Sequence, residues 1–509
     1  MNNRGRISYI VVLTTATLVF PGREFAQAPK AQGDDKSTLA VAKSELAKHQ
    51  LKPAEESVWK VLSSDPNSAE ALLLLGVIRD QQQRYPEAEA VLQKAVQLDP
   101  KSAAARIYLG KTYVTENKVS EAIDQYQHAE ELAPRNVEVR VTLARLYAAS
   151  GEFALALTAL NAVPPARLPT EAIPVKVGSL LATGHAEEAV QLADAVRNPS
   201  ANLALAEIFV TSKLPAQALK MLSAAEASGK RPPARFYYIK AKALDAAGNE
   251  TAALENFKKA TALEPSSEEF LLGTAELYAR EGKHELAYEV LQRANKAAPG
   301  SPAILRPLIL EASFAGKSTE VQEAAEQLAT KSDDPKDLFV AASVFLKSTR
   351  QDEAIPLLQK YLEKYPDDPS AWVGLGLGYE DQKKFPDAQK AFESALRADP
   401  KFAEAEYQLG VITELSGNSA AASQHYERAL EMNPEHASAM MKLGKLYLEA
   451  GQYERARDVL LKAESIAPQD RETEYDLALV YSKLGNHEEA KAHMAKFQKA
   501  GPIGATEKR

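Results

Sequence analysis

The sequence of 509 residues contains no cysteine. This absence excludes disulfides, thiolate metal ligands, a cysteine nucleophile and a lipid-modified N-terminal cysteine. Basic residues are not in excess either, because 61 lysines and arginines face 69 aspartates and glutamates, giving a formal net charge of −8. Nucleic acids bind through an excess of positive charge that displaces counterions. The charge balance therefore argues against a nucleic-acid partner.

Long apolar runs are also scarce, since the main one lies at residues 7–20 and no second long run follows. Two arginines precede this run, and the small-x-small sequence Ala26-Gln27-Ala28 follows it, which is the layout of a secretory signal peptide. The run is short for a transmembrane helix, which needs about 20 residues. We therefore predict that residues 1–28 are a signal peptide and that the mature chain has no transmembrane span and is periplasmic or secreted. The alternative is an uncleaved N-terminal membrane anchor. The polar residues 29–36 are expected to be flexible.

Most of the remaining chain is a repeat. Prolines close successive units in steps of thirty-four residues within three groups: Pro66, Pro100 and Pro134, then Pro265 and Pro299, then Pro366, Pro400, Pro434 and Pro468. A period of this length indicates stacked supersecondary units. In the unit that starts at Ala69, apolar residues follow helical spacing twice, with a polar turn between the two runs. Each unit is therefore predicted to be a helical hairpin.

A small residue follows a leucine in the first helix of many units. It is glycine at Gly76, Gly110, Gly376, Gly410 and Gly444. Glycine inside a helix costs about 1 kcal/mol relative to alanine, so we predict that the paired helix leaves no room for a Cβ atom there. Tyrosine recurs late in the first helix and is predicted to fill the space between adjacent hairpins, at Tyr113, Tyr147, Tyr278, Tyr379, Tyr447 and Tyr481.

One unit carries these features together, namely Trp372, Leu375-Gly376, Tyr379, Ala388, Phe392, Ala395 and Pro400. This pattern resembles the full tetratricopeptide repeat signature. The resemblance covers roughly residues 35–500. It implies an all-α, right-handed α-solenoid of about fourteen stacked helical hairpins, in which first helices line a concave groove and second helices face outward.

The repeat is regular in some parts of the chain and degenerate in others. Regular units are expected at 37–163, 234–299 and 336–500, degenerate units at 164–233 and 300–335, and a flexible tail at 501–509. Several prolines interrupt the first degenerate segment, and Pro307 falls inside a first helix of the second. The degenerate segments are either kinks between solenoid segments or ordinary divergent units.

No residue pattern in the sequence points to catalysis. His487 and His493 are six residues apart, whereas metal ligands on one helical face are three or four apart. With Glu488 and Glu489 they are interpreted as a solvated surface of the last repeat. The "GLGLG" sequence at 374–378 is expected inside a helix rather than in a phosphate-binding loop. We therefore predict a non-enzymatic protein without catalytic residues, metal ligands or cofactor.

The resemblance also implies which side chains point into the groove, namely the fifth and ninth residues of each unit. In the C-terminal units these are Val373, Leu377, Tyr407, Val411, Met441, Lys445, Tyr475 and Leu479. This stripe is mostly apolar, and the acids Glu404, Glu414, Glu449 and Glu472 are expected to rim it. An apolar centre with a charged rim is typical of a protein recognition site.

The leading hypothesis is an exported scaffold that binds one or more proteins or peptides through this groove. Its setting would be an envelope assembly, secretion or polysaccharide-export complex. The alternative is an accessory module that binds a glycan or its synthase, which would need exposed aromatic and acidic residues along the groove. A repeat-bearing enzyme is the third hypothesis, and it would need a catalytic domain outside the repeats.

Overall fold

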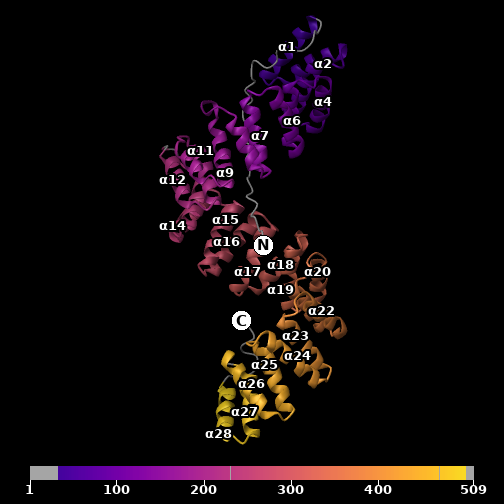
Figure 1. The fold of residues 1–509 in the computed structure, drawn as a ribbon, viewed down its shortest axis with the longest axis vertical. Coiled ribbons are helices and arrows are strands. Elements are labelled where there is room, and N and C mark those ends of the chain that lie inside the picture. Colours follow the sequence, from indigo (N-terminus) through magenta and orange to yellow (C-terminus); the bar gives the residue numbers. More distant parts are fainter. Residues whose placement is uncertain (1–32, 228, 230, 469, 500–509) are drawn as a thin grey trace. The chain divides into compact units, whose positions relative to one another are not determined.

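The computed structural model of the protein describes residues 33–227, 229, 231–468 and 470–499. These residues form α-helices joined by short turns, with two 3-10 turns and no strand among them (Figure 1). The predicted signal peptide at 1–28 and the predicted tail at 501–509 lie outside the described residues. The all-α stack of about fourteen helical hairpins is confirmed, whereas its handedness stays a prediction.

Contacts divide the chain into two compact units, Met1–Ala260 and Thr261–Arg509. The helices that begin in the first unit are α1 (Gly33–Ala47), α2 (Leu51–Ser64), α3 (Ala69–Gln81), α4 (Tyr85–Leu98), α5 (Ala103–Thr115), α6 (Val119–Leu132), α7 (Val137–Ala149), α8 (Phe153–Asn161), α9 (Ile173–Ala182), α10 (Ala186–Asp194), α11 (Pro199–Thr211), α12 (Pro215–Glu226), α13 (Ala234–Ala246) and α14 (Glu250–Leu263). The 3-10 turns η1 (Pro165–Arg167) and η2 (Thr170–Ala172) join α8 to α9.

The second unit holds the remaining helices, among them those of the predicted binding stripe. They are α15 (Glu268–Arg280), α16 (His284–Ala297), α17 (Pro302–Phe314), α18 (Ser318–Lys331), α19 (Pro335–Lys347), α20 (Gln351–Lys364), α21 (Pro369–Asp381), α22 (Phe385–Ala398), α23 (Ala403–Leu415), α24 (Ser419–Met432), α25 (Ala437–Glu449), α26 (Tyr453–Ile466), α27 (Arg471–Lys483) and α28 (His487–Lys499). The odd-numbered helix of each pair is the first helix of a hairpin, and the even-numbered one is the second.

Many first helices begin at a side-chain cap. Ser68 Oγ accepts a hydrogen bond from the backbone N–H of Ala71 at 3.4 Å, and Asp368 Oδ1 accepts one from Ser370 at 2.9 Å. Short polar side chains are favoured at this position because they satisfy N–H groups that the helix itself leaves free. A closing proline two residues before such a cap therefore ends one helix and leads into the next.

The turn inside each hairpin is set by one residue with positive φ. At the end of α21, Lys383 has a φ of 59°, and the N–H of Lys384 bonds back to the carbonyl of Tyr379 at 2.9 Å. This is the Schellman arrangement that ends helices. The equivalent residue has positive φ in every hairpin, and glycine, which adopts this conformation without strain, is the commonest residue there: His49, Gln83, Asn117, Gly151, Gly184, Lys213, Gly248, Gly282, Gly316, Thr349, Lys383, Gly417, Gly451 and Gly485.

The steric explanation for the first-helix glycines is confirmed. A Cβ on Gly410 would lie 2.5 Å from the ring of Tyr426, and one on Gly76 would lie 2.4 Å from Leu92. The atoms that fill this space belong to a large side chain of the paired helix rather than to its backbone. The "GLGLG" sequence does lie inside α21, as predicted.

The late tyrosines also lie where the sequence placed them, between hairpins. The Tyr113 hydroxyl accepts a hydrogen bond from Gln93 Nε2 of the preceding second helix at 2.9 Å, and Gln127 bonds Tyr147 in the same way at 2.7 Å. In these hairpins an aromatic ring covers the next hairpin and a hydrogen bond fastens it. This nearest-neighbour arrangement is what allows a repeat stack to grow in one dimension.

The N-terminal segment and the two degenerate segments can be compared with what the sequence predicts. Of the residues 29–36 that the sequence assigns to a flexible segment, 29–32 lie outside the described residues and 33–36 begin α1, where the Ser64 hydroxyl donates a hydrogen bond to Asp35 at 3.2 Å. The degenerate segment 164–233 contains the hairpins α9–α10 and α11–α12. In the other degenerate segment, Pro307 lies inside α17, as the sequence indicated.

Candidate protein-binding face of the C-terminal repeats

First helices in the second unit contact one another directly, α19 with α21, α21 with α23, and α25 with α27. The resemblance implies that such first helices line the concave side of the stack. We call the side chains that α21, α23, α25 and α27 present there the first-helix face. The eight residues that the sequence assigned to the groove all come from these four helices.

One of these eight residues is not available to a ligand. Val373 is only 5% exposed and belongs to the core that includes Phe392 and Leu409. Assigning it to a binding surface was wrong, because its side chain packs between the helices of neighbouring hairpins. The half-buried residues of the set are Leu377, Tyr407, Val411, Met441 and Leu479, and the exposed ones are Lys445 and Tyr475.

The two tyrosines of the stripe have different surroundings. Tyr407 lies between neighbours, with ring centroids 5.8 Å from Tyr426 and 4.9 Å from His436. Tyr475 is 41% exposed, and the Phe497 ring, at 5.2 Å, supports it from behind. Tyr407 therefore serves mainly to pack one hairpin on the next, whereas Tyr475 presents an aromatic surface to solvent.

The predicted acidic rim is correct in part. Glu449 and Glu472 are exposed. Glu404, in contrast, pairs with His436 Nε2 at 3.3 Å, and Glu414 accepts a hydrogen bond from the Tyr426 hydroxyl at 2.6 Å. These last two acids are engaged in internal contacts, so only part of the rim is free to meet a ligand.

Sequence reasoning missed an acid next to Tyr475 on α27. Asp476 on α27 is half-buried, and burial raises its pKa to about 6. Glu472, Glu449 and Asp470 raise the pKa further, while Lys445 opposes them. One lysine thus faces four carboxylates, which leaves a local excess of negative charge.

A second acid with a raised pKa lies on α21. Burial raises the pKa of Glu380 on α21, with a smaller contribution from Asp381. Its Oε2 atom is buried and accepts no hydrogen bond. A buried carboxylate without a partner lowers stability, and such positions are often kept for function.

We predict that Glu380→Gln stabilises the protein at neutral pH by about 0.5–1 kcal/mol, a value reduced for partial solvent exposure. A raised folded-state pKa means that the cost of this charge is present at neutral pH and absent once the pH is low enough to protonate the group in both states. The gain should therefore vanish near pH 4 in urea unfolding curves.

Glu404→Gln is the control for this prediction. The hydrogen bond from His436 leads the interactions that lower the pKa of Glu404, so its charge stabilises the fold at neutral pH and loses that effect as the pH falls. Glu404→Gln should therefore lower the stability of the protein at neutral pH, the opposite of the effect expected for Glu380→Gln. If both substitutions act in the same direction, the assignment of Glu380 as an uncompensated charge is wrong.

Three exposed apolar side chains on first helices were also missed: Leu310 at 53%, Phe314 at 63% and Leu415 at 62% exposure. Leu310 is at the ninth position of its unit, but it lies in the segment 300–335, which was interpreted as degenerate. Phe314 and Leu415 are at the thirteenth position of their units, whereas the sequence analysis assigned only the fifth and ninth positions to the groove. Extending that assignment by one helical turn would have found them.

His493 does not belong to a solvated surface. It is 8% exposed, and its Nδ1 atom lies 2.6 Å from Glu474 Oε2. The spacing of Ala490, His493, Met494 and Phe497 follows the inner face of α28, so helical periodicity could have placed it. Glu488 and Glu489 are exposed, as expected.

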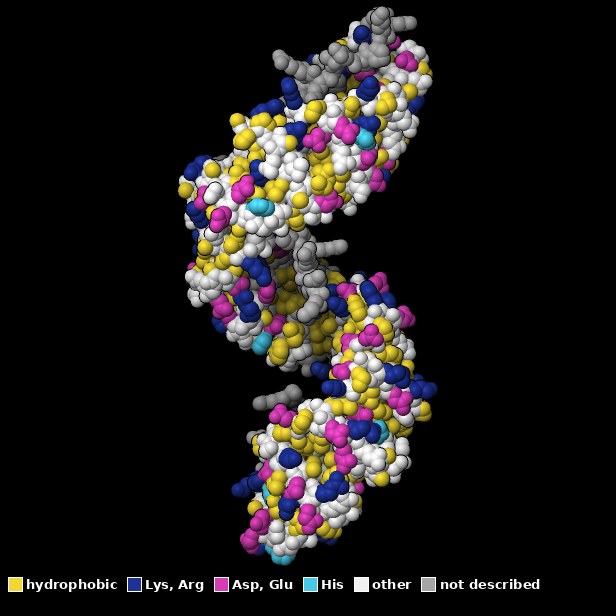
Figure 2. Space-filling model, in the orientation of Figure 1, with side chains coloured by type: hydrophobic (Ala, Val, Ile, Leu, Met, Phe, Trp, Pro, Cys, Tyr) yellow, Lys and Arg dark blue, Asp and Glu magenta, His cyan; other side chains and the backbone are white. Residues whose placement is uncertain are grey.

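Acidic and basic side chains are interspersed over the visible surface, with hydrophobic side chains between them (Figure 2). Among the described helices, none combines the length and the apolar character needed to cross a bilayer.

Comparisons with solved structures returned other repeat proteins. The APC/C hetero-tetramer Cut9-Hcn1 is 16% identical, with 93% of this chain and 95% of that chain covered and a TM-score of 0.43. YrrB, described as a TPR protein with an unusual peptide-binding site, is 20% identical over 37% of this chain and 97% of its own, with a TM-score of 0.33. A tetratricopeptide repeat protein from Parabacteroides merdae is 17% identical over 48% of this chain and 99% of its own, with a TM-score of 0.38.

The search of curated proteins found no match. Three family models match, and each is described as Tetratricopeptide repeat. The first matches residues 39–103, 203–268, 339–401, 375–422 and 416–471, the second 81–131, 113–172 and 246–306, and the third 475–500. These matches cover most of the chain and include hairpins on both sides of the first degenerate segment. The chain therefore belongs to the tetratricopeptide repeat family, whose repeats form scaffolds for protein–protein interaction.

Proposed function

We propose that this protein is an exported, non-catalytic scaffold that binds proteins or peptides through its C-terminal first-helix face. Its setting would be an envelope assembly, secretion or polysaccharide-export complex. The observation that carries the binding proposal is a pair of half-buried carboxylates with raised pKa values, Glu380 on α21 and Asp476 on α27, on helices of a face that also exposes Tyr475.

The charge of this face indicates the chemistry of the ligand. A ligand cation placed beside Glu380 or Asp476 would add positive charge that the chain itself supplies only in part. Tyr475 and Leu415 offer apolar surface for aliphatic or aromatic side chains. The expected ligand is therefore an extended or helical peptide with lysine or arginine among apolar residues.

Selection from a phage-displayed peptide library tests this proposal and does not require the natural partner. The full chain should enrich peptides that combine basic and apolar residues. The double variant Glu449→Lys/Glu472→Lys, which reverses two exposed charges of the face, should lose this enrichment. The matched control is Glu431→Lys/Glu435→Lys, which changes the same net charge at exposed positions of the neighbouring α24 hairpin outside the face. Equal enrichment by all three proteins would contradict the proposal.

A glycan ligand is the second candidate, and one observation favours it. The sequence hypothesis required exposed aromatic and acidic residues along the groove, and Tyr475 beside Asp476 meets that requirement at one point. Binding to a glycan array tests this alternative. Saturable glycan binding that Tyr475→Ala abolishes, together with an empty peptide selection, would replace the peptide proposal by the glycan one.

Export is proposed from the sequence of residues 1–28. N-terminal sequencing of the mature protein should begin near Pro29. Intact Met1 in a cytosolic fraction would contradict export, and an intact N-terminus in the membrane fraction would favour the anchored alternative.

A further inference from the structure

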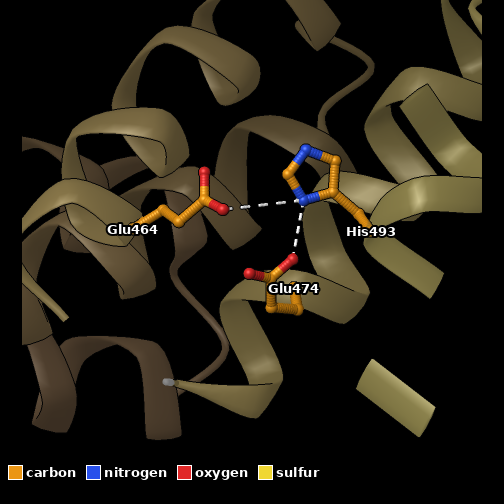
Figure 3. Close-up of side chains that lie close together, drawn as sticks. All are labelled: Glu464, Glu474 and His493. Carbon is orange, nitrogen blue, oxygen red and sulfur yellow. Dashed lines mark hydrogen bonds and ion pairs between the residues drawn. The ribbon is translucent and has the colours of Figure 1, made fainter. Parts of the chain in front are cut away.

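Three ionisable side chains from three different helices converge where the last hairpin packs on the one before it. Glu464 comes from α26, Glu474 from α27 and His493 from α28 (Figure 3). His493 Nδ1 lies 2.6 Å from Glu474 Oε2 and 3.9 Å from Glu464 Oε1. One potential ligand atom of each residue lies within 4.8 Å of the others, and among the described residues this group alone has that geometry.

The cluster is enclosed and held in place. Glu474 is 4% exposed, His493 is 8% exposed, and Glu464 is half-buried. The ring of Tyr481 stacks on the imidazole at 5.3 Å with an interplanar angle of 11°. The imidazole is therefore oriented by packing as well as by its carboxylate partner.

Positive charge reaches the cluster from its solvent side. Lys496 pairs with Glu464, and its Nζ lies 3.3 Å from Glu474 Oε1. The Lys496 side chain is 52% exposed, so it can turn into water without disturbing the packing. Two carboxylates thus face one exposed ammonium and the imidazole.

The same arrangement occurs two repeats earlier, without the second carboxylate. There His425 Nδ1 lies 2.7 Å from Glu406 Oε2, and Arg428 Nε donates to Glu406 Oε1 at 3.0 Å. The residue equivalent to Glu464 is Leu396, which packs against the core of its hairpins. One carboxylate, one histidine and one basic residue therefore suffice to fasten a hairpin, and Glu464 is an addition that fastening does not require.

We propose that Glu464, Glu474 and His493 form a site for a divalent transition-metal ion of the zinc class. Zinc binds imidazole nitrogen and carboxylate oxygen at about 2.0–2.2 Å, which in a tetrahedral site places ligand atoms about 3.3–3.5 Å apart. The observed 2.6 and 3.9 Å bracket that separation, so small side-chain rotations are enough. Water would complete the coordination.

The charges balance when the metal ion takes the place of the Lys496 ammonium. The incoming ion brings two positive charges, while the Lys496 ammonium turns to solvent. The proton by which His493 Nδ1 donates to Glu474 must leave that atom: an imidazolium releases it to water, and a neutral imidazole releases it while Nε2 takes up a proton, so that Nδ1 can bind the ion. The ion would join α26 to the last hairpin, so metal binding would stabilise the C-terminal end of the stack. Oxygen-preferring magnesium and calcium would bind this nitrogen-containing, three-ligand site much more weakly.

The test uses the full-length protein with cobalt(II) and zinc(II). Cobalt should give the visible absorption bands of tetrahedral coordination, zinc should displace it at one equivalent, and zinc should raise the melting temperature. Glu464→Leu, which installs the residue of the earlier cluster, should weaken zinc binding at least about tenfold. His425→Ala and His128→Ala are controls that should leave the affinity unchanged.

Lys496→Gln makes the test independent of damage to the fold. Removing the competing ammonium should strengthen zinc binding, and a misfolded variant would not gain affinity. The proposal is overturned if cobalt gives only octahedral bands, if Glu464→Leu binds zinc as tightly as the wild type, or if Lys496→Gln binds zinc no more tightly.

Discussion

Leucine in place of Gly410 is expected to lower the free energy of unfolding of the C-terminal repeats by about 3 kcal/mol, at the upper end of the range for overpacked sites. The Cβ alone would lie 2.5 Å from a ring atom of Tyr426. Tyr426 is fully buried, and its hydroxyl donates a hydrogen bond to Glu414 at 2.6 Å. The ring therefore cannot move aside without losing both its packing and its hydrogen bond.

The damage should remain local, because each hairpin contacts mainly its neighbours. Amide hydrogen exchange should accelerate around residues 370–470, while the hairpins of the first unit keep their protection. The matched control is Gly374→Ala in α21, whose added Cβ would lie 3.6 Å from its nearest neighbour, an ordinary contact distance. That control should be neutral or slightly stabilising, since alanine favours the helix. Unchanged exchange in Gly410→Leu would refute the close-packing explanation.

The fold was predictable because each level of the sequence specifies the same hairpin. The closing prolines, the polar caps such as Ser68 and the positive-φ turn residues recur about thirty-four residues apart in the regular units, and each has a local physical cause. The glycines add a tertiary signal, because Gly410 is explained only by a large residue in the paired helix. Local signals of this kind survive in a single sequence, and no comparison with relatives is needed to read them.

The candidate site was less predictable, because side-chain exposure depends on what the next hairpin supplies. Val373 and Tyr475 occupy the same position in their repeats, yet neighbouring core residues cover Val373, whereas the Tyr475 ring remains open to solvent. Tyr407 differs from Tyr475 because His436 of the following hairpin covers it. A position within the repeat predicts the direction of a side chain, and the identity of its neighbours decides whether a ligand can reach it.

The two histidine–carboxylate clusters also show which contacts a sequence can predict and which it cannot. The pairing of Glu406 with His425 joins residues nineteen positions apart in one hairpin, and the identical offset joins Glu474 to His493. This repetition could have been found in the sequence once the hairpin register was known. The repeat pattern does not explain why one cluster has Glu464 where the other has Leu396. Only the packed structure shows that Glu464 lies beside Glu474 and His493.

Replacing Tyr475 by alanine is expected to weaken binding of the peptide selected from the library by about tenfold or more, because an aromatic anchor of this kind contributes over about 1 kcal/mol. The 41% exposed ring lies beside Asp476 and rests on Phe497, so it can contact a ligand without rearrangement. Tyr407→Ala should act differently, lowering stability more than affinity, because its ring packs against Tyr426 and His436. Fluorescence anisotropy with the labelled peptide measures the affinity.

The control is Leu461→Ala on α26, which removes an apolar side chain of similar exposure, 36%, from a second helix. It should leave peptide affinity unchanged. Hydrogen exchange of α28 in Tyr475→Ala separates a lost contact from a loosened last hairpin, because only loosening would accelerate exchange around Phe497. If Tyr475→Ala binds the peptide at full strength while α28 keeps its protection, the binding surface does not include this ring. The exposed Leu310 and Phe314 on α17 would then be the first-helix residues to test next.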